Sequence, residues 1–169
     1  MTDTGIIYFD MDGVLADFDR GVAEILHLPP IEQGKHTARQ DDELFAGMRE
    51  VGHFYGMLEP IPGSVELFGE VYQKHGDRCR ILSGIPKASR GVVHAAADKR
   101  EWVERFLPGG VIVNTVLRAE KPMFVKSSRD ILIDDFSRNI SEWEEAGGTG
   151  ILFVSASGLR EKLLEMGIL

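Results

Sequence analysis

Short apolar runs alternate along the chain with longer segments in which apolar residues recur every three or four positions. Five of the short runs have the length of a β-strand, and they cover residues 6–9, 79–82, 111–113, 131–133 and 151–154. Continuous apolar runs of this length are typical of strands that are buried on both faces of a parallel sheet. We therefore expect the five runs to form one mainly parallel sheet.

The segments between these runs have helical periodicity. One begins near Ser64 and ends at Gly76 after a cation-rich turn, as helices commonly do. Asp98 and Glu101 have the spacing of a capping box, which predicts that another helix begins at Asp98. Further helices are expected around 140–143 and after Ser157. Alternating strands and helices indicate an α/β fold, a three-layer sandwich with a mainly parallel sheet.

One region interrupts the alternation. Residues 17–60 contain no strand-like run but two helical patterns, one with Phe18 and Leu26 and one with Leu44 and Val51. We interpret residues 17–60 as a small helical cap and residues 1–16 together with 61–169 as the core domain. A cap inserted after the first strand would cover a site at the carboxyl edge of the sheet, where open α/β folds bind ligands. The alternative is that these helices simply pack on the sheet.

Polar residues follow three of the predicted strands directly. They are Asp10 and Asp12 after the first run, Ser83 and Gly84 after the second, and Asp134 and Asp135 after the fourth. The carboxyl ends of parallel strands lie at one edge, so four carboxylates would converge there. Carboxylates repel one another unless a cation compensates them, and Mg²⁺ prefers such oxygen ligands. The alternative is that these aspartates are solvated turn residues.

This set of side chains suits the hydrolysis of phosphate monoesters. A carboxylate can attack phosphorus and so divide hydrolysis into two displacements, while a second carboxyl protonates the departing oxygen and then deprotonates water. Gly13 permits the turn that would bring Asp10 and Asp12 to one phosphorus. The Ser83 hydroxyl and the Gly84 amide can donate to the phosphate oxygens, and a lysine should supply further positive charge.

The segment from Phe9 to Leu15 resembles the first signature of the haloacid dehalogenase-like (HAD) phosphatase superfamily. Ser83 resembles the second signature, Lys121 or Lys126 the third, and the pair Asp134 and Asp135 the fourth. The resemblance implies that Asp10 is the nucleophile and Asp12 the general acid and base. It also implies that Mg²⁺ is held by Asp10, the backbone carbonyl of Asp12 and Asp134, with Asp135 as an auxiliary that orients a metal-bound water.

Within the superfamily the chain is most similar to the 5'(3')-deoxyribonucleotidases. The similar segments are 10–18, 60–63, 100–103 and 131–152, and the cap has the place and approximate length of theirs. The resemblance implies hydrolysis of deoxyribonucleoside monophosphates, with the cap contacting the base. Alternatives are another small phosphorylated metabolite as substrate, or a receiver-like or non-catalytic phosphate-binding domain.

Two details of the resemblance stay open. Ser83 stands where that family more often has threonine, and either of two lysines can be the phosphate-binding one. Lys121 is preferred because an apolar run follows it, whereas Lys126 lies nearer to Asp134. In the cap, residues 53–55 either stack on a base or pack the cap against the core.

The composition of the chain limits the molecules that we expect it to bind. The chain has 169 residues, 27% of them charged, and a net charge of -8, which disfavours nucleic acid and anionic membrane as partners.

The N-terminal residues lack the features of a signal peptide or membrane span, and the single cysteine, Cys79, suits a reducing compartment, so we expect a cytoplasmic protein. The histidines lack the spacing of a zinc site, and the glycines at 147–150 lack the lysine of a P-loop. The oligomeric state is not readable from the sequence.

Overall fold

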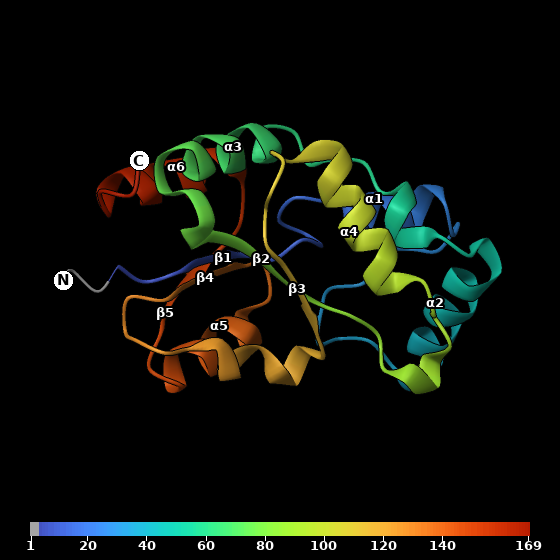
Figure 1. Cartoon of the computed structure of the whole chain (residues 1–169). Coiled ribbons are helices and arrows are strands. Elements are labelled where there is room, and N and C mark those ends of the chain that lie inside the picture. Colours follow the sequence, from blue (N-terminus) through green and yellow to red (C-terminus); the bar gives the residue numbers. More distant parts are fainter. Residues whose placement is uncertain (1–3) are drawn as a thin grey trace.

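The computed structural model describes residues 4–169 as a five-stranded parallel sheet between two layers of helices (Figure 1). Residues 1–3 of the predicted core segment 1–16 lie outside this range. The order of the strands is β3-β2-β1-β4-β5, so β1 is central. The strands are β1 (Ile7–Phe9), β2 (Cys79–Gly84), β3 (Val113–Val116), β4 (Ile131–Asp134) and β5 (Thr149–Leu152). The predicted fold class, a three-layer α/β sandwich, is confirmed.

Different helices cover the two faces of the sheet. Phe9 pairs with Ile81 on one side and Ile133 on the other, and these side chains pack against α3 (Ser64–His75), α4 (Ala95–Phe106) and α6 (Ala156–Glu165). Tyr8 and its neighbours face the opposite layer, which consists of α5 (Ser137–Glu145) and the 3-10 segment η4 (Arg118–Phe124). Successive residues of a strand point to opposite faces of the sheet, so the apolar runs supply buried side chains to both faces.

The predicted strand limits were wrong at both edges of the sheet. β3 begins at Val113 because Ile81 of β2 pairs with Val113, two residues later than the apolar run suggests. β5 begins at Thr149 because Thr149 pairs with Ile131 of β4. Val154, which the apolar run included, is 85% exposed. Edge strands have a neighbour on one side only, so their sequences are less uniformly apolar.

The capping box predicted at Asp98 was also wrong. α4 begins at Ala95, and Asp98 lies inside it with its Oδ1 atom 2.9 Å from Nδ1 of His53. The last helix begins at Ala156, and its N-cap is Ser155, whose side chain accepts a hydrogen bond from the Gly158 amide. In both cases the helix begins earlier than predicted.

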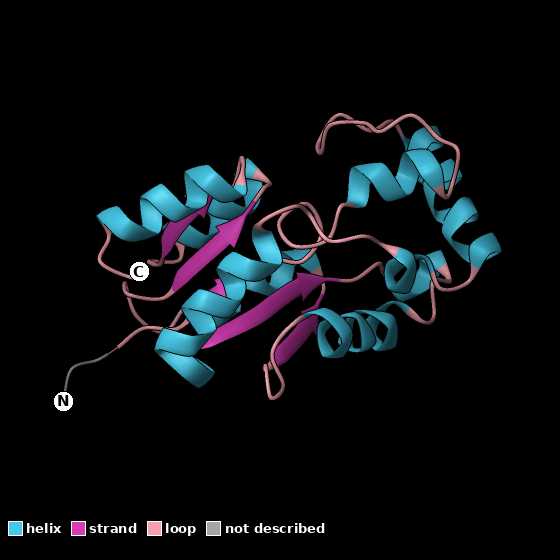
Figure 2. Ribbon diagram, turned by 90° about the horizontal axis from the view of Figure 1, so that it is seen from above, coloured by secondary structure: helices cyan, strands magenta, loops and turns pink. Residues whose placement is uncertain are grey.

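The helices inserted between β1 and α3 lie beyond the carboxyl ends of the strands (Figure 2). They are α1 (Phe18–Glu24), α2 (Ala38–Val51) and the 3-10 turn η1 (Phe54–Met57), and a capping box of Thr37 and Gln40 begins α2. Ala16 bridges both Asp12 and Pro60, so the chain leaves the core and returns to it at neighbouring points. No helix in the described part of the chain is long and apolar enough to cross a membrane.

Candidate active site

The loop after β1 is a tight turn against the end of β4. The amide of Asp10 donates to the carbonyl of Ile133 at 2.9 Å, which continues the pairing of the two strands. Gly13 has a φ of +80°, and a Cβ atom at this position would lie 2.1 Å from Oδ2 of Asp135. Only glycine fits such a turn, since it has no Cβ and tolerates a positive φ. Gly13 therefore lets the carboxylate of Asp135 approach the loop.

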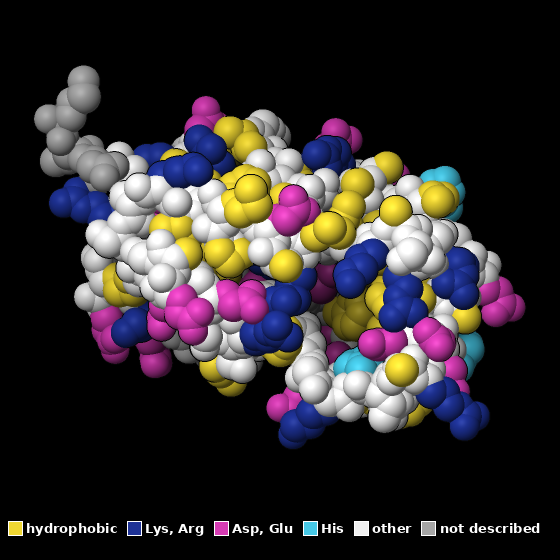
Figure 3. All heavy atoms as spheres, turned by 90° about the horizontal axis from the view of Figure 1, so that it is seen from below, with side chains coloured by type: hydrophobic (Ala, Val, Ile, Leu, Met, Phe, Trp, Pro, Cys, Tyr) yellow, Lys and Arg dark blue, Asp and Glu magenta, His cyan; other side chains and the backbone are white. Residues whose placement is uncertain are grey.

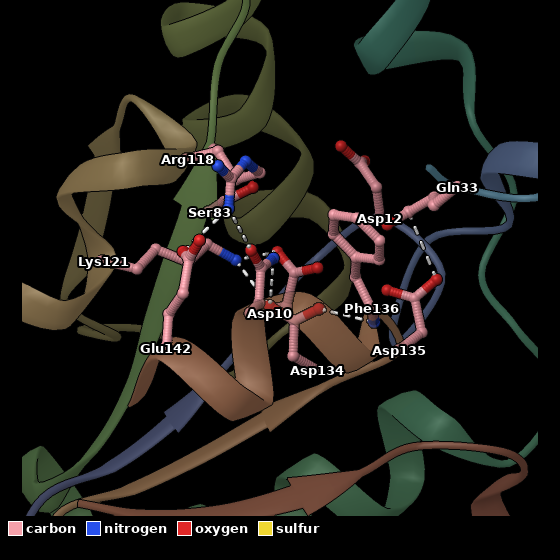
Figure 4. Close-up of polar contacts among 12 residues, drawn as sticks. Asp10, Asp12, Gln33, Ser83, Arg118, Lys121, Asp134, Asp135, Phe136 and Glu142 are labelled. Carbon is pink, nitrogen blue, oxygen red and sulfur yellow. Dashed lines mark hydrogen bonds and ion pairs between the residues drawn. The ribbon is translucent and has the colours of Figure 1, made fainter. Parts of the chain in front are cut away.

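Three carboxylates meet at this end of the sheet, as Figure 4 shows. Oxygen atoms of Asp10, Asp134 and Asp135 lie within 4.8 Å of one another. Asp134 is fully buried; its Oδ1 accepts from the Phe136 amide at 2.9 Å and its Oδ2 from the Asn139 amide group at 3.0 Å. In contrast, Oδ1 of Asp135 is buried and has no hydrogen-bond partner among residues 4–169.

Of the two candidate lysines, the structure brings Lys121 to these carboxylates. Its Nζ lies 3.1 Å from Oδ1 of Asp10 and 2.8 Å from Oδ2 of Asp134, and the residue is buried. Lys126 is exposed, and its Nζ donates instead to the carbonyl of Met123. The two lysines are only five residues apart, but Lys121 lies within η4 and is buried, whereas Lys126 follows η4 and is exposed.

Burial and mutual repulsion make the carboxylates of this group unfavourable to ionise. Burial, helped by the charge of Asp134, raises the pKa of Asp10 from 3.8 to about 7. Burial, together with the charges of Asp10 and Asp134, raises the pKa of Asp135 from 3.8 to about 8. Burial alone would lower the pKa of Lys121, but the two adjacent carboxylates outweigh it and raise that pKa. The oxygen-only donor set and the unpartnered oxygen of Asp135 fit a hard divalent cation.

Asp12 lies apart from this group of three. Figure 4 shows its carboxylate turned away from Asp10 and Asp134, and its Oδ2 lies 2.7 Å from Nζ of Lys99. The same Nζ donates to Oγ of Ser83 at 2.8 Å and to the carbonyl of Gly84 at 2.7 Å. Lys99 is therefore a central residue that the sequence analysis missed.

A cavity of about 450 Å³ lies between the carboxyl edge of the sheet and the inserted helices. The molecule is hollowed on this side, with hydrophobic side chains inside the hollow and charged ones around it (Figure 3). Asp10, Asp12, Gly84 and Lys121 lie at the sheet end of the cavity. The inserted segment contributes Phe18, Gln33, Gly34, His36, Asp41, Leu44, Phe45 and Tyr55.

Arg118 and Asn139 also line the cavity, and the sequence analysis missed both. Nη1 of Arg118 lies 3.1 Å from Oδ1 of Asn139 and 2.9 Å from Oε2 of Glu142. Arg118 precedes Lys121 by three residues, and Asn139 follows Asp134 by five, so both flank predicted site residues. Their proximity to the motifs is the signal that could have found them.

The aromatic segment 53–55 packs against both α1 of the insertion and the region of α4. Phe54 is fully buried, with its ring perpendicular to that of Phe18. His53 contacts Asp98 and stacks on His94, outside the residues that line the cavity. Tyr55 is buried too, but it lines the cavity, and its ring centroid lies 4.4 Å from Nζ of Lys99.

Comparisons with known proteins agree on one family. The model of the family described as 5' nucleotidase, deoxy (pyrimidine), cytosolic type C protein matches residues 32–160. A provisionally named 5'(3')-deoxyribonucleotidase of Vibrio phage KVP40 is 34% identical over 138 residues, which cover 82% of this chain and 70% of the relative. The human cytosolic 5'(3')-deoxyribonucleotidase is 27% identical over 163 residues, 87% of this chain and 78% of the relative.

A solved structure shows the same architecture. The crystal structure of a HAD family hydrolase from Deinococcus radiodurans R1, with bound phosphate and sodium, superposes with a TM-score of 0.64. Its sequence is 16% identical, and the alignment covers 98% of this chain and 97% of that one. The likeness shows a HAD-like fold.

Proposed function

This chain belongs to the 5'(3')-deoxyribonucleotidase family of HAD-type phosphomonoester hydrolases, and from that membership we propose that it hydrolyses deoxyribonucleoside monophosphates. The observation that carries this proposal is that Asp10 and Lys121 line one end of a cavity, with Asp134 and Asp135 next to Asp10. The opposite wall belongs to the inserted helices. A phosphate therefore has a charged end to occupy, and a nucleoside has an adjoining chamber of suitable size.

In the proposed reaction, a carboxylate oxygen of Asp10 attacks phosphorus and the ester oxygen departs. Asp12 protonates that oxygen and then removes a proton from the water that releases phosphate from Asp10. Lys121 has two acceptors, Asp10 and Asp134, and an ammonium group has three hydrogens, so one remains for a phosphate oxygen. Ser83 and Gly84 end β2 beside this position and are proposed to bind the phosphate from the other side.

We propose Mg²⁺ as the cation, held by Asp10, the backbone carbonyl of Asp12 and Asp134. When bound, it would neutralise charge on the phosphoryl oxygens. The unpartnered Oδ1 of Asp135 supports a closer role for that residue than orienting a water, because the oxygens of Asp134 already accept three hydrogen bonds. Asp135 is therefore added to the proposed ligands.

Residues 17–60 are proposed to act as the cap that contacts the base. Phe18, Phe45 and Tyr55 bring aromatic surface to the cavity, while Gln33 and His36 bring hydrogen-bonding groups. Aromatic rings bind a planar base through their faces, and the polar groups would select its edge.

A substrate panel tests the proposal. Purified protein with Mg²⁺ is assayed for phosphate release from deoxyribonucleotides, ribonucleotides, sugar phosphates and an aryl phosphate. We expect the highest kcat/KM with a deoxyribonucleotide, and loss of turnover in Asp10→Asn but not in Asp77→Asn, which removes an exposed carboxylate remote from the cavity. A preference for sugar phosphates would instead support the other-metabolite alternative. No turnover on the whole panel would support a receiver-like or non-catalytic domain.

The remaining partner predictions belong to this proposal too. We propose a cytoplasmic protein with a nucleoside monophosphate as its partner, on the argument from Cys79 and the net charge of -8. Cell fractionation tests the location. Electrophoretic mobility shifts and vesicle sedimentation test the prediction that the protein binds neither nucleic acid nor anionic membrane.

A further inference from the structure

Lys99 is a fully buried lysine whose hydrogen-bonding capacity is used up inside the protein. It lies on α4 and is 0% exposed. Its Nζ donates to Oδ2 of Asp12, Oγ of Ser83 and the carbonyl of Gly84, all at 2.7 to 2.8 Å. An ammonium group has three hydrogens, so none is left for a ligand. Lys99 is also absent from the residues that line the cavity, whereas Lys121 is among them.

The hydrogen bond to Lys99 makes the two oxygens of Asp12 unequal. Oδ2 is fixed by the ammonium group, while Oδ1 is buried and has no hydrogen-bond partner among residues 4–169. Asp12 still lines the cavity. We propose that Lys99 is a positioning residue for the hydrolysis proposed above: it fixes Asp12 through Oδ2 so that Oδ1 carries the transferred proton.

In the first step, the bond between Asp10 and phosphorus forms as the ester bond breaks. The electron pair of that bond stays on the departing alcohol oxygen, which takes the proton from Oδ1 of Asp12. Asp12 becomes a carboxylate, and the positive charge of Lys99 at Oδ2 stabilises it. In the second step, Oδ1 takes a proton from water as that water attacks phosphorus, and the bond to Asp10 breaks to release phosphate.

Two contacts besides the hydrogen bond to Asp12 keep Lys99 in place. Its Nζ lies 4.4 Å from the ring centroid of Tyr55, a cation–π contact from the inserted segment. Ser83 is fully buried and accepts from Lys99 through Oγ, so this contact does not use its hydroxyl hydrogen. Both contacts therefore hold the ammonium group beside Asp12.

Leaving-group dependence tests the role of Lys99. Alkoxide, the leaving group of a nucleotide, needs a proton as it departs, whereas 4-nitrophenolate does not. For Lys99→Met we expect kcat/KM to fall about 100-fold or more with a deoxyribonucleoside 5'-monophosphate, the range of a general acid, and less than about tenfold with 4-nitrophenyl phosphate. KM for the nucleotide should change little, and Lys99→Arg should recover part of kcat. Equal losses on both substrates, or a loss that lies mainly in KM, would overturn the proposal.

A second variant covers the case in which Lys99→Met fails to fold because Asp12 is left unpaired. The neutral pair Asp12→Asn/Lys99→Met has no unpaired charge at this position. We expect it to match Asp12→Asn in nucleotide turnover and in inorganic phosphate affinity, since Lys99 acts through Asp12. A further loss of more than about tenfold in phosphate affinity would make Lys99 a phosphate ligand and refute the inference. If the wild-type protein itself hydrolyses neither substrate, the proposed function fails, and not this inference alone.

Discussion

Replacing Asp135 with asparagine tests how strongly uncompensated carboxylates destabilise the metal-free protein. Burial raises the pKa of Asp135 to about 8 and that of Asp10 to about 7, from 3.8 for each in a solvated chain. The folded protein therefore keeps protons that the unfolded chain has already lost. Its free energy of unfolding is highest below about pH 4 for these groups and falls as the pH rises to about 8.

The size of this destabilisation follows from the range of pH between the pKa in the unfolded chain and the pKa in the folded protein. A difference of one bound proton changes the free energy of unfolding by about 1.4 kcal/mol per pH unit. The pKa of Asp135 differs by roughly four units between the folded and unfolded states, which gives an upper bound of about 6 kcal/mol. Asp135 is partly solvated and shares its protons with Asp10, so we expect about half of that. In a protein of this length, about 2 to 3 kcal/mol corresponds to a shift in Tm of roughly 5 to 10 °C.

Thermal melts in the presence of a chelator measure this difference. Between about pH 5 and pH 8, Tm should fall more in the wild type than in Asp135→Asn, and Mg²⁺ should restore Tm in the wild type at about pH 8. Asp77→Asn is the matched control, because Asp77 is exposed and the charge change is the same. Parallel pH profiles for wild type and Asp135→Asn would show that Asp135 is not buried against Asp10, and would refute the reasoning.

Three other substitutions have clear expected outcomes. Gly13→Ala places a Cβ 2.1 Å from Asp135 at a φ of +80°. Thermal melts should show that the free energy of unfolding falls by about 1 to 3 kcal/mol, and calorimetric titration should show weaker Mg²⁺ binding. Gly69→Ala is the control, because the space around Gly69 is open. Lys121→Met removes a buried positive charge beside the phosphate position, so kcat for nucleotides should fall about 100-fold or more. Phe45→Ala should raise KM for nucleotides severalfold and leave that for 4-nitrophenyl phosphate nearly unchanged, as steady-state kinetics would show.

The central strands were predictable because both of their faces are covered. β1, β2 and β4 are almost entirely buried, so each is mostly apolar before its polar end, with Arg80 of β2 as the exception. The edge strands were misplaced because they mix apolar and polar residues, as in Asn114 and Thr115 of β3. An apolar-run criterion then selects the neighbouring residues, although the register with the next strand decides where pairing begins.

The residues of the site were also predictable only in part. Asp10, Asp134 and Ser83 lie at strand ends, so the topology of a parallel sheet already brings them to one edge. Lys99 comes from a helix, and its approach to Asp12 depends on how α4 packs. Lys99 lies three residues before Trp102 on the buried face of that helix, which is the signal that a charged residue there is not solvated.

The charges around the cavity also indicate which kind of cation the site accepts. Within residues 4–169, four carboxylates (Asp10, Asp12, Asp134 and Asp135) lie at the sheet edge, with Lys99 and Lys121 bonded among them. Arg118 is already paired with Glu142. When all four carboxyl groups are ionised, two negative charges remain uncompensated. A divalent cation balances them and a monovalent one does not, so a phosphate dianion can enter an electrically neutral site only after a divalent ion has bound.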